Sequence, residues 1–236
     1  MYLCDALKGS LGLCALLLAA CSGIPSSQEG RLADPTVKPK LLAKAVVVEA
    51  EPAQAGPVDV YILPLDDFPI ATARAFARRL SQELSLNVRA AAPVETAKLA
   101  PTSSGQFAAE DIMTTVIPTT DTLPDRHAKT IYLLYTRRDI NDREAKSRYL
   151  FAHSNIDRRM SVISTHRMYW DYRWVTPSAD LNSRLWKMSK RAVGEHYYGL
   201  PRTGDIQDIM YSPLLSPEDI DRIGNEFRGL PAPSVK

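Results

Sequence analysis

The sequence predicts an α/β (α+β) fold in which a mixed sheet is covered by helices. Short apolar runs of β-type residues alternate with stretches whose apolar residues recur at helical spacing, as in a helix-covered sheet. Two further β-type runs follow as a hairpin. About 190 residues remain after the N-terminal region, which is enough for one domain.

The first half of this domain is predicted to alternate strand and helix. Residues 58–65 form a compact β-type run closed by a proline, and residues 71–84 follow with apolar side chains at helical spacing. The pattern continues with a strand over residues 86–92, a helix over 106–116 and a strand over 130–135.

The second half begins with the hairpin and ends in two helices. Residues 149–152 and 160–165 are its predicted strands, joined by a polar turn over 154–157. A helix is expected over residues 182–198, and Gly199 is expected to end it. Ser216 is expected to cap a last helix that has a proline in its first turn.

The N-terminal region has the pattern of a bacterial lipoprotein. Residues 1–20 read as its signal peptide, and Leu18-Ala19-Ala20-Cys21 fits a lipobox whose cysteine is lipidated. An ordinary signal peptide or a membrane helix is the alternative, but the apolar run is shorter than the roughly 20 residues of a span. Ser22 favours an outer-membrane anchor that faces the periplasm over one in the inner membrane.

The mature chain is predicted to be one tethered domain without disulfides. Residues 21–45 read as the lipidated cysteine and a flexible tether, because they are rich in polar residues and proline and lack periodicity. Residues 46–236 read as the domain, with a sheet subdomain to about residue 199 and a C-terminal subdomain over about 200–230. The formal net charge of +2 predicts no nucleic-acid partner.

The helix over residues 182–198 carries part of a zinc-peptidase motif. It resembles the H-E-x-x-H-x-x-G-x-x-H segment of metzincins, with His196 at the second histidine and Gly199 at the glycine. Ala192 then stands at the first histidine, Val193 at the general-base glutamate and Arg202 at the third histidine. Met210 stands in a segment that resembles the methionine turn beneath the metal.

The order of strands and helices over residues 58–224 resembles the archaemetzincin branch of this family. The resemblance implies a metzincin-like twisted mixed sheet with covering helices, the motif helix and a small C-terminal subdomain. It also implies a catalytic zinc, but two of the three histidine positions and the base position hold other residues here. The cysteine set that archaemetzincins use for a second zinc is absent from the mature chain.

These losses predict a cell-envelope pseudo-peptidase without a cofactor, which acts as a binding or assembly module for an unknown protein or peptide. One alternative is an active metallopeptidase with a rearranged zinc site. A second alternative is a lipid-anchored α/β domain without peptidase ancestry. The rearranged site would combine His196 with Glu195, with Asp205 or Asp208, and with His166.

Several residues near the motif have a second, structural interpretation. If Glu195 is not part of a metal site, it is expected on a solvated helix face. If His153 and His166 do not line a ligand pocket, they are expected to be hydrogen-bonded structural histidines. His127 is expected at the surface, and Arg137-Arg138-Asp139 is expected to be a solvated loop end. The aromatic run over residues 169–174 could bind a ligand, but core packing is the expected role.

Overall fold

The computed structural model describes residues 56–102, 104–144, 148–171, 176–177 and 180–229. The predicted signal peptide, Cys21 and the tether lie outside these residues, as does the centre of the aromatic run. The elements follow the chain in this order: β1 (Val58–Pro64), α1 (Ile70–Leu84), β2 (Val88–Ala90), β3 (Phe107–Ala108), α2 (Ala109–Thr122), β4 (Arg126–Thr136), β5 (Ile140–Asn141), β6 (Ala152–Asn155), β7 (Met160–Ser164), β8 (Trp170–Asp171), β9 (Thr176–Pro177), α3 (Leu181–His196) and α4 (Pro217–Arg222).

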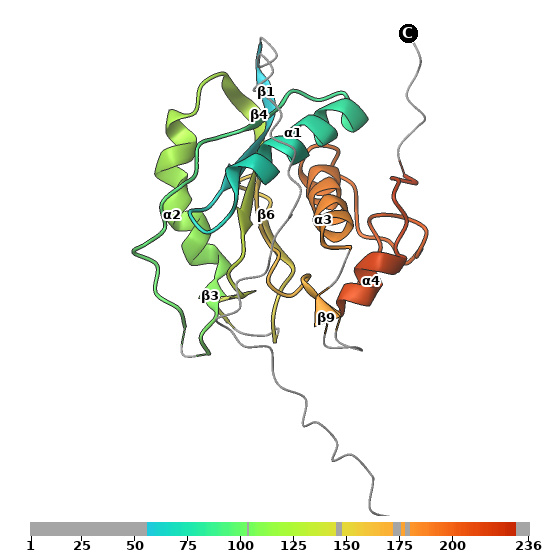
Figure 1. Ribbon diagram of the computed structural model, residues 1–236. Helices are drawn as coiled ribbons and strands as arrows, with labels where there is room; N and C mark the ends of the chain where they lie inside the picture. The colour runs from blue at the N-terminus through green and yellow to red at the C-terminus, as the bar shows by residue number, and fades with distance from the viewer. Residues whose placement is uncertain (1–55, 103, 145–147, 172–175, 178–179, 230–236) are drawn as a thin grey trace, which may run out of the picture. The chain divides into compact units, whose positions relative to one another are not determined.

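The central sheet has five strands in the order β2-β1-β4-β7-β6 (Figure 1). Strands β2, β1, β4 and β7 run parallel, and β6 pairs antiparallel with β7 at one edge. The strand pairs β3-β5 and β8-β9 lie outside this sheet. The predicted mixed sheet is therefore confirmed, with β6 as its antiparallel edge strand.

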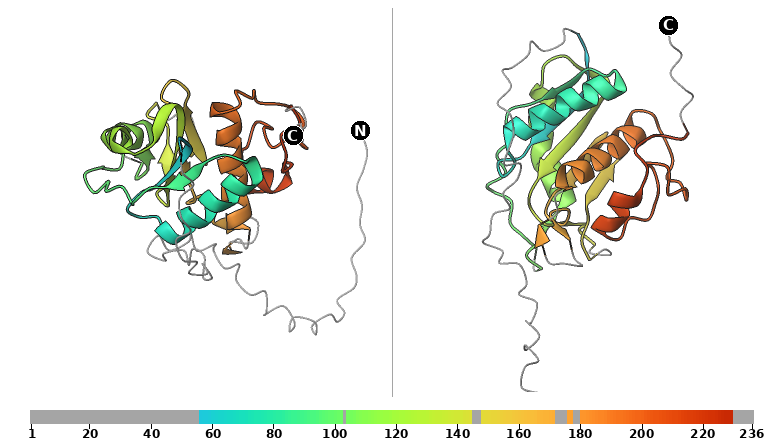
Figure 2. Two further views of the ribbon diagram at one scale, coloured as in Figure 1. Left: turned by 90° about the horizontal axis from the view of Figure 1, so that it is seen from above. Right: turned by 45° about the vertical axis from the view of Figure 1, so that its right-hand side comes forward.

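Alternating residues of the inner strands face two separate hydrophobic cores. Val60 and Ile62 of β1 pack in one core with α1 and α3, whereas Tyr61 and Leu63 pack in the other with α2. Successive side chains of a strand point to opposite faces, so a strand that is apolar throughout serves both cores. Figure 2 shows the result, with α2 on one side of the sheet and α1 and α3 on the other.

Helix α3 is buried on nearly all sides, although it contains several basic residues. Arg184 binds the carboxylate of Asp221 through two nitrogens and donates to the carbonyl oxygen of Met168. The Nζ atom of Lys187 donates to the carbonyl oxygens of Ile220, Asp221 and Ile223 at the end of α4. A cation is favourable beside the last carbonyls of a helix. These basic side chains therefore hold the C-terminal segment against α3.

Two predicted elements begin a few residues later in the chain than expected. Strand β6 begins at Ala152, three residues later than predicted, because its polar Ser154 and Asn155 pair with β7 and leave the turn to residues 156–159. Helix α2 begins at Ala109 and passes Pro118 to end at Thr122. Proline removes one backbone hydrogen bond from a helix, but the helix continues past Pro118, and Val116 and Thr120, two residues before and after it, are both buried.

The last helix begins as predicted. The Ser216 hydroxyl accepts a hydrogen bond from the backbone of Asp219, whose carboxylate accepts one from the backbone of Ser216. This reciprocal capping box satisfies two of the backbone donors left free at a helix start. Within the residues that the structure covers, no helix has the length and apolar character needed to cross a membrane.

Candidate functional site

A cleft of about 360 Å³ lies between the edge strand of the sheet and helix α3. Residues 149–154 form one wall, α3 forms the floor, and three residues of the C-terminal segment close the other side. Consecutive residues of β6 line the cleft although their side chains point to opposite faces, so the cleft runs along the edge of the strand. The floor and the closing side consist of Met188, Arg191, Glu195, Arg202, Ser212 and Leu214.

The cleft face of α3 is offset by one residue from the positions aligned with the zinc motif. Arg191 and Glu195, four residues apart, line the cleft. Ala192 and Val193 belong instead to the core beneath the sheet, and Val193 is 0% exposed. His196 is buried and faces β7. The positions assigned to the first ligand, the base and the second ligand therefore point away from the cleft.

Arg191 is a buried cation at the floor of the cleft, with 4% of the residue exposed. Its Nη1 atom donates to the carbonyl oxygens of Ile209 and Tyr211 at 2.5 and 2.6 Å. Its Nε atom is buried and has no hydrogen-bond partner in the described part of the chain. Burial, followed by the nearby charge of Arg202, lowers the pKa of Arg191 to about 9.

Glu195 joins both sides of the cleft, so its interpretation as a solvated helix residue is wrong. Its Oε2 atom accepts hydrogen bonds from Ser154 of β6 and from Arg202, both at 2.8 Å. The side chains of Arg202 and Glu195 are 37% and 21% exposed, so solvent weakens this ion pair only in part. Arg202 occupies the third-ligand position of the motif and here binds a carboxylate.

His196 is tied to the sheet and lies outside the cleft lining. Its Nε2 atom lies 2.8 Å from the hydroxyl of Ser161 on β7, and that hydroxyl lies 2.8 Å from Ser154. A hydrogen-bonded chain thus runs from His196 through two serines to Glu195. Burial lowers the pKa of His196; the carboxylate of Glu195 opposes this shift, and Arg159 and Arg202 reinforce it.

The buried histidine predicts a loss of stability in mild acid. An unfolded histidine binds a proton near pH 6.5, whereas folded His196 does so only at lower pH, so the unfolded state binds more protons below 6.5. The contribution of His196 is therefore complete above pH 6.5 and is lost as the pH falls. Below pH 6.5 the free energy of unfolding therefore falls with pH. We expect His196→Gln to make this fall shallower by up to about 1.4 kcal/mol per pH unit.

Urea unfolding at about pH 7 and about pH 5.5 measures this difference. His166→Gln, which changes an exposed histidine, is the matched control. Equal pH dependence in the wild type and in His196→Gln would contradict the prediction.

Met210 lies directly against the backbone of α3. It is 1% exposed, and a Cβ atom added to Gly194 would lie 2.8 Å from its sulfur. Glycine at 194 therefore allows this close approach. The Oδ1 atom of Asp208 accepts a hydrogen bond from the backbone of Met210 at 2.8 Å, so Asp208 supports the turn beneath the helix.

Gly199 redirects the chain after α3 towards the cleft. Its φ of 65° lies in the left-handed region, which glycine adopts without strain. The backbone of Leu200 donates to the carbonyl oxygen of Gly194 at 2.9 Å and closes the helix end. This turn brings Arg202 within reach of Glu195.

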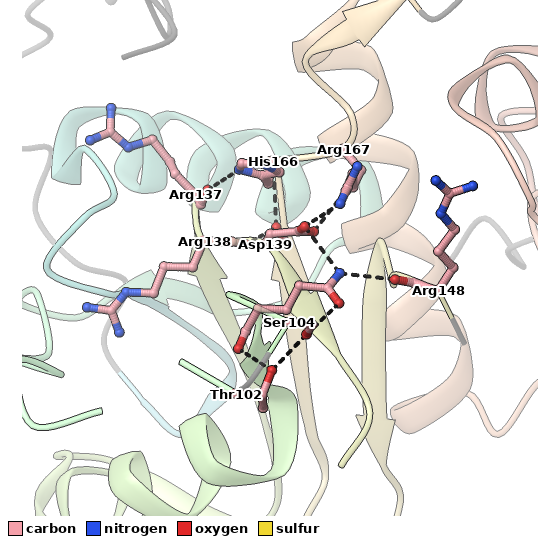
Figure 3. A network of polar contacts seen from close by, with 10 residues as sticks. Thr102, Ser104, Arg137, Arg138, Asp139, Arg148, His166 and Arg167 are labelled. Carbon is pink, nitrogen blue, oxygen red and sulfur yellow. Dashed lines mark hydrogen bonds and ion pairs between the residues drawn. The ribbon is translucent and has the colours of Figure 1, made fainter. Parts of the chain in front are cut away.

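A polar network anchors the start of the strand-side wall (Figure 3). The carboxylate of Asp139 accepts hydrogen bonds from Nε and Nη2 of Arg167 and from Gln106. Gln106 also donates to the carbonyl oxygen of Arg148, just before the wall begins. The interpretation of Asp139 as a solvated loop end is therefore wrong, because its carboxylate is held by Arg167 and by Gln106, and Gln106 in turn holds the backbone at Arg148.

The remaining candidate residues do not meet at one site. His153 lines the cleft with its Nε2 atom 3.6 Å from Glu110 of α2, whereas His166 contacts the carbonyl oxygen of Arg137 at the network. Asp205 forms an exposed ion pair with Arg228 at 3.0 Å. In the described ranges, no three His, Cys, Asp or Glu residues are grouped so that they could hold a metal ion.

Arg191 is the site residue that the sequence interpretation missed. Basic residues on a helix usually face solvent, and nothing in the motif alignment selects position 191. A signal was nevertheless present, because Arg184, Lys187 and Arg191 recur at spacings of three and four beside the apolar stripe. A helix with two such stripes has two faces to bury.

The comparisons with known proteins concern the fold. No protein-family model and no curated protein matches the chain. The structure is similar to archaemetzincin from Archaeoglobus fulgidus in complex with malonate, at 21% identity and a TM-score of 0.55, over 72% of this chain and 95% of that one.

Two further solved structures give the same result. Archaemetzincin from Methanopyrus kandleri has 18% identity and a TM-score of 0.55, over 75% of this chain and 92% of that one. A zinc-dependent peptidase from Methanocorpusculum labreanum has 17% identity and a TM-score of 0.58, over 72% of this chain and 96% of that one. The predicted archaemetzincin-like fold is thereby confirmed.

Proposed function

We propose that the protein is a lipid-anchored, non-catalytic relative of the archaemetzincin-fold peptidases that binds a peptide or protein at the cell envelope. The observation that carries the proposal is the cleft floor, where Arg191, Glu195 and Arg202 converge. Zinc sites in proteins need three or four nitrogen, sulfur or oxygen ligands. A guanidinium has no acceptor atom for a metal and repels it. The residues of this cleft therefore do not fit a catalytic zinc.

The edge strand supports a peptide as the ligand. Strand β6 is the last strand of its sheet, and the cleft runs along it. An extended peptide can add to such an edge through backbone hydrogen bonds. The network around Asp139 fixes the start of this wall, which reduces the ordering that binding requires.

The membrane anchor is the second part of the proposal. Lipid at Cys21, followed by the polar residues 22–45, would tether the domain to the outer membrane on its periplasmic side. The domain needs no zinc to hold its C-terminal segment, because Arg184, Lys187 and Arg191 bind that segment directly. A fold of this kind can persist after its chemistry is lost.

One preparation of the full chain, made in a bacterial host and purified from membranes with detergent, tests both parts. We expect mass spectrometry to find lipid on Cys21 as the N-terminal residue, and elemental analysis to find less than about 0.1 zinc per chain. We also expect no cleavage of unstructured peptides. Stoichiometric zinc together with cleavage would establish the alternative, a rearranged metallopeptidase that uses His196.

A further inference from the structure

The charge of Arg191 has no direct ion-pair partner among the described residues, and the carboxylates of Glu195 and Asp208 act on it only through space. The hydrogen bonds of its guanidinium go to the neutral carbonyl oxygens of Ile209 and Tyr211. Across the described residues, no carboxylate forms an ion pair with it, and Glu195 instead binds Arg202. A buried charge without an opposite partner is costly, and the cost falls when an anion binds.

The unsatisfied Nε atom lies in a side chain that lines the cleft. Arg191 is buried to more than nine-tenths, and its Nε–H has no acceptor. A guanidinium presents donors in a fixed fork that matches the two oxygens of a carboxylate. Ser212 lines the same cleft, and its hydroxyl is of a type suited to hydrogen bonds with a polar ligand.

The charge balance of the cleft floor favours a single negative charge. Glu195 neutralises Arg202 and leaves one net positive charge on the floor, that of Arg191. The carboxylate of Glu195 would repel a doubly charged anion more strongly than a singly charged one. A volume of about 360 Å³ lies in the range of small-ligand sites and suits the end of a peptide.

We infer that the cleft binds a carboxylate of a peptide through Arg191, with Arg202 as a second, exchangeable partner. This inference rests on the proposed function and names the chemistry that the peptide must carry. The carboxylate would lie at the cleft floor beside Arg191, while the peptide backbone follows β6. Its source is either the C-terminus of the peptide or an Asp or Glu side chain.

Three short probes separate these sources: acetyl-Ala-Ala-Ala as the free acid, the same peptide as its C-terminal amide, and acetyl-Ala-Glu-Ala amide. Each is titrated into the full chain and followed by the arginine Nε–H signals in ¹⁵N–¹H spectra. We expect the free acid to shift the Arg191 signal and to bind at least about tenfold more tightly than its amide. Binding of the glutamate peptide would also support the inference and would identify a side chain as the source.

Two variants test the residues. Arg202→Gln changes a partly exposed side chain and is expected to weaken binding several-fold, whereas Arg191→Gln is expected to weaken it by about tenfold or more. Arg191→Lys keeps the charge and should retain part of the affinity if Arg191→Gln proves unstable. Arg74→Gln, on the exposed face of α1, is the control and should bind as the wild type does.

The inference is overturned if the free acid and its amide bind equally, if neither carboxylate peptide binds, or if only inorganic phosphate binds. The inference is also overturned if Arg202→Gln and the Arg191 variant that folds, either Arg191→Gln or Arg191→Lys, both bind the free acid as tightly as the wild type does. Zinc analysis of the same sample separates this failure from that of the proposed function. If the protein is free of zinc and does not bind carboxylates, only this inference is refuted. Stoichiometric zinc refutes both this inference and the proposed function.

Discussion

The triple variant Arg191→His, Glu195→His, Arg202→His is expected to bind one zinc ion per chain. Positions 191 and 195 lie four apart on the cleft face of α3, and position 202 already reaches position 195. Two histidines with this spacing on one helix face can share a metal, and a third from the following turn completes a three-nitrogen site. The substitutions also remove both cations that would repel zinc.

The matched control places the histidines where the motif alignment does. Ala192→His with Arg202→His adds two histidines to His196, but positions 192 and 196 face the core and β7. We expect no zinc binding by this variant and a loss of about 1–3 kcal/mol of stability, because a ring must enter the packed core.

Zinc binding is measured by elemental analysis and by thermal unfolding. Zinc at about a hundred times its Kd should stabilise the triple variant by about 2.7 kcal/mol, or about 5–10 °C in Tm. The reverse outcome, zinc binding by the 192/196/202 set alone, would mean that the cleft face of α3 is assigned wrongly and that the sequence alignment gives the correct positions.

This offset marks the limit of what the sequence predicts. The alternation of strands and helices, the antiparallel edge, the long helix and the capped last helix follow from local patterns of apolar, proline and capping residues, and the structure has them. The direction in which a helix side chain points depends on rotation by about 100° per residue, so an error of one position changes a cleft residue into a core residue. Sequence alone did not set that rotation.

Long-range partners were the other missing information. Glu195, Asp139 and Arg191 each resemble ordinary surface charges in the sequence, and each is held by residues distant along the chain. Ser154 of the edge strand and Glu195 of α3 are 41 positions apart. The local pattern of apolar residues carries no information about such long-range contacts. These contacts nevertheless determine which charges line the cleft.

Gly224→Ala is expected to be the most destabilising single change in the C-terminal segment. A Cβ atom at position 224 would lie 1.8 Å from the carbonyl oxygen of Gln207 and 2.5 Å from its carbonyl carbon. These are backbone atoms, so no side-chain rotation relieves the overlap and the two chain segments must separate. Their separation would break the hydrogen bonds Gly224 N–H to Ile206 O and Ile209 N–H to Glu226 O.

Two lost hydrogen bonds and the disturbed packing around Ile209 give an expected loss of about 3 kcal/mol or more. For a domain of this size, that corresponds to a fall of about 6–12 °C in Tm. Gly204→Ala is the matched control, because a Cβ atom there meets nothing within 4 Å and the residue has no positive φ. We expect it to stay within about 0.5 kcal/mol of the wild type.

Gly224→Ala should also weaken carboxylate binding in the cleft, because it displaces the backbone segment to which Arg191 is hydrogen-bonded. Ile209 supplies one of the two carbonyl oxygens that hold the guanidinium, and Gln207 lies two residues before it. A shift of this segment would leave Arg191 less fixed and would lower its affinity for a carboxylate. Carboxylate affinity that stays at the wild-type level while Gly224→Ala lowers Tm would mean that the cleft floor is positioned by α3 alone.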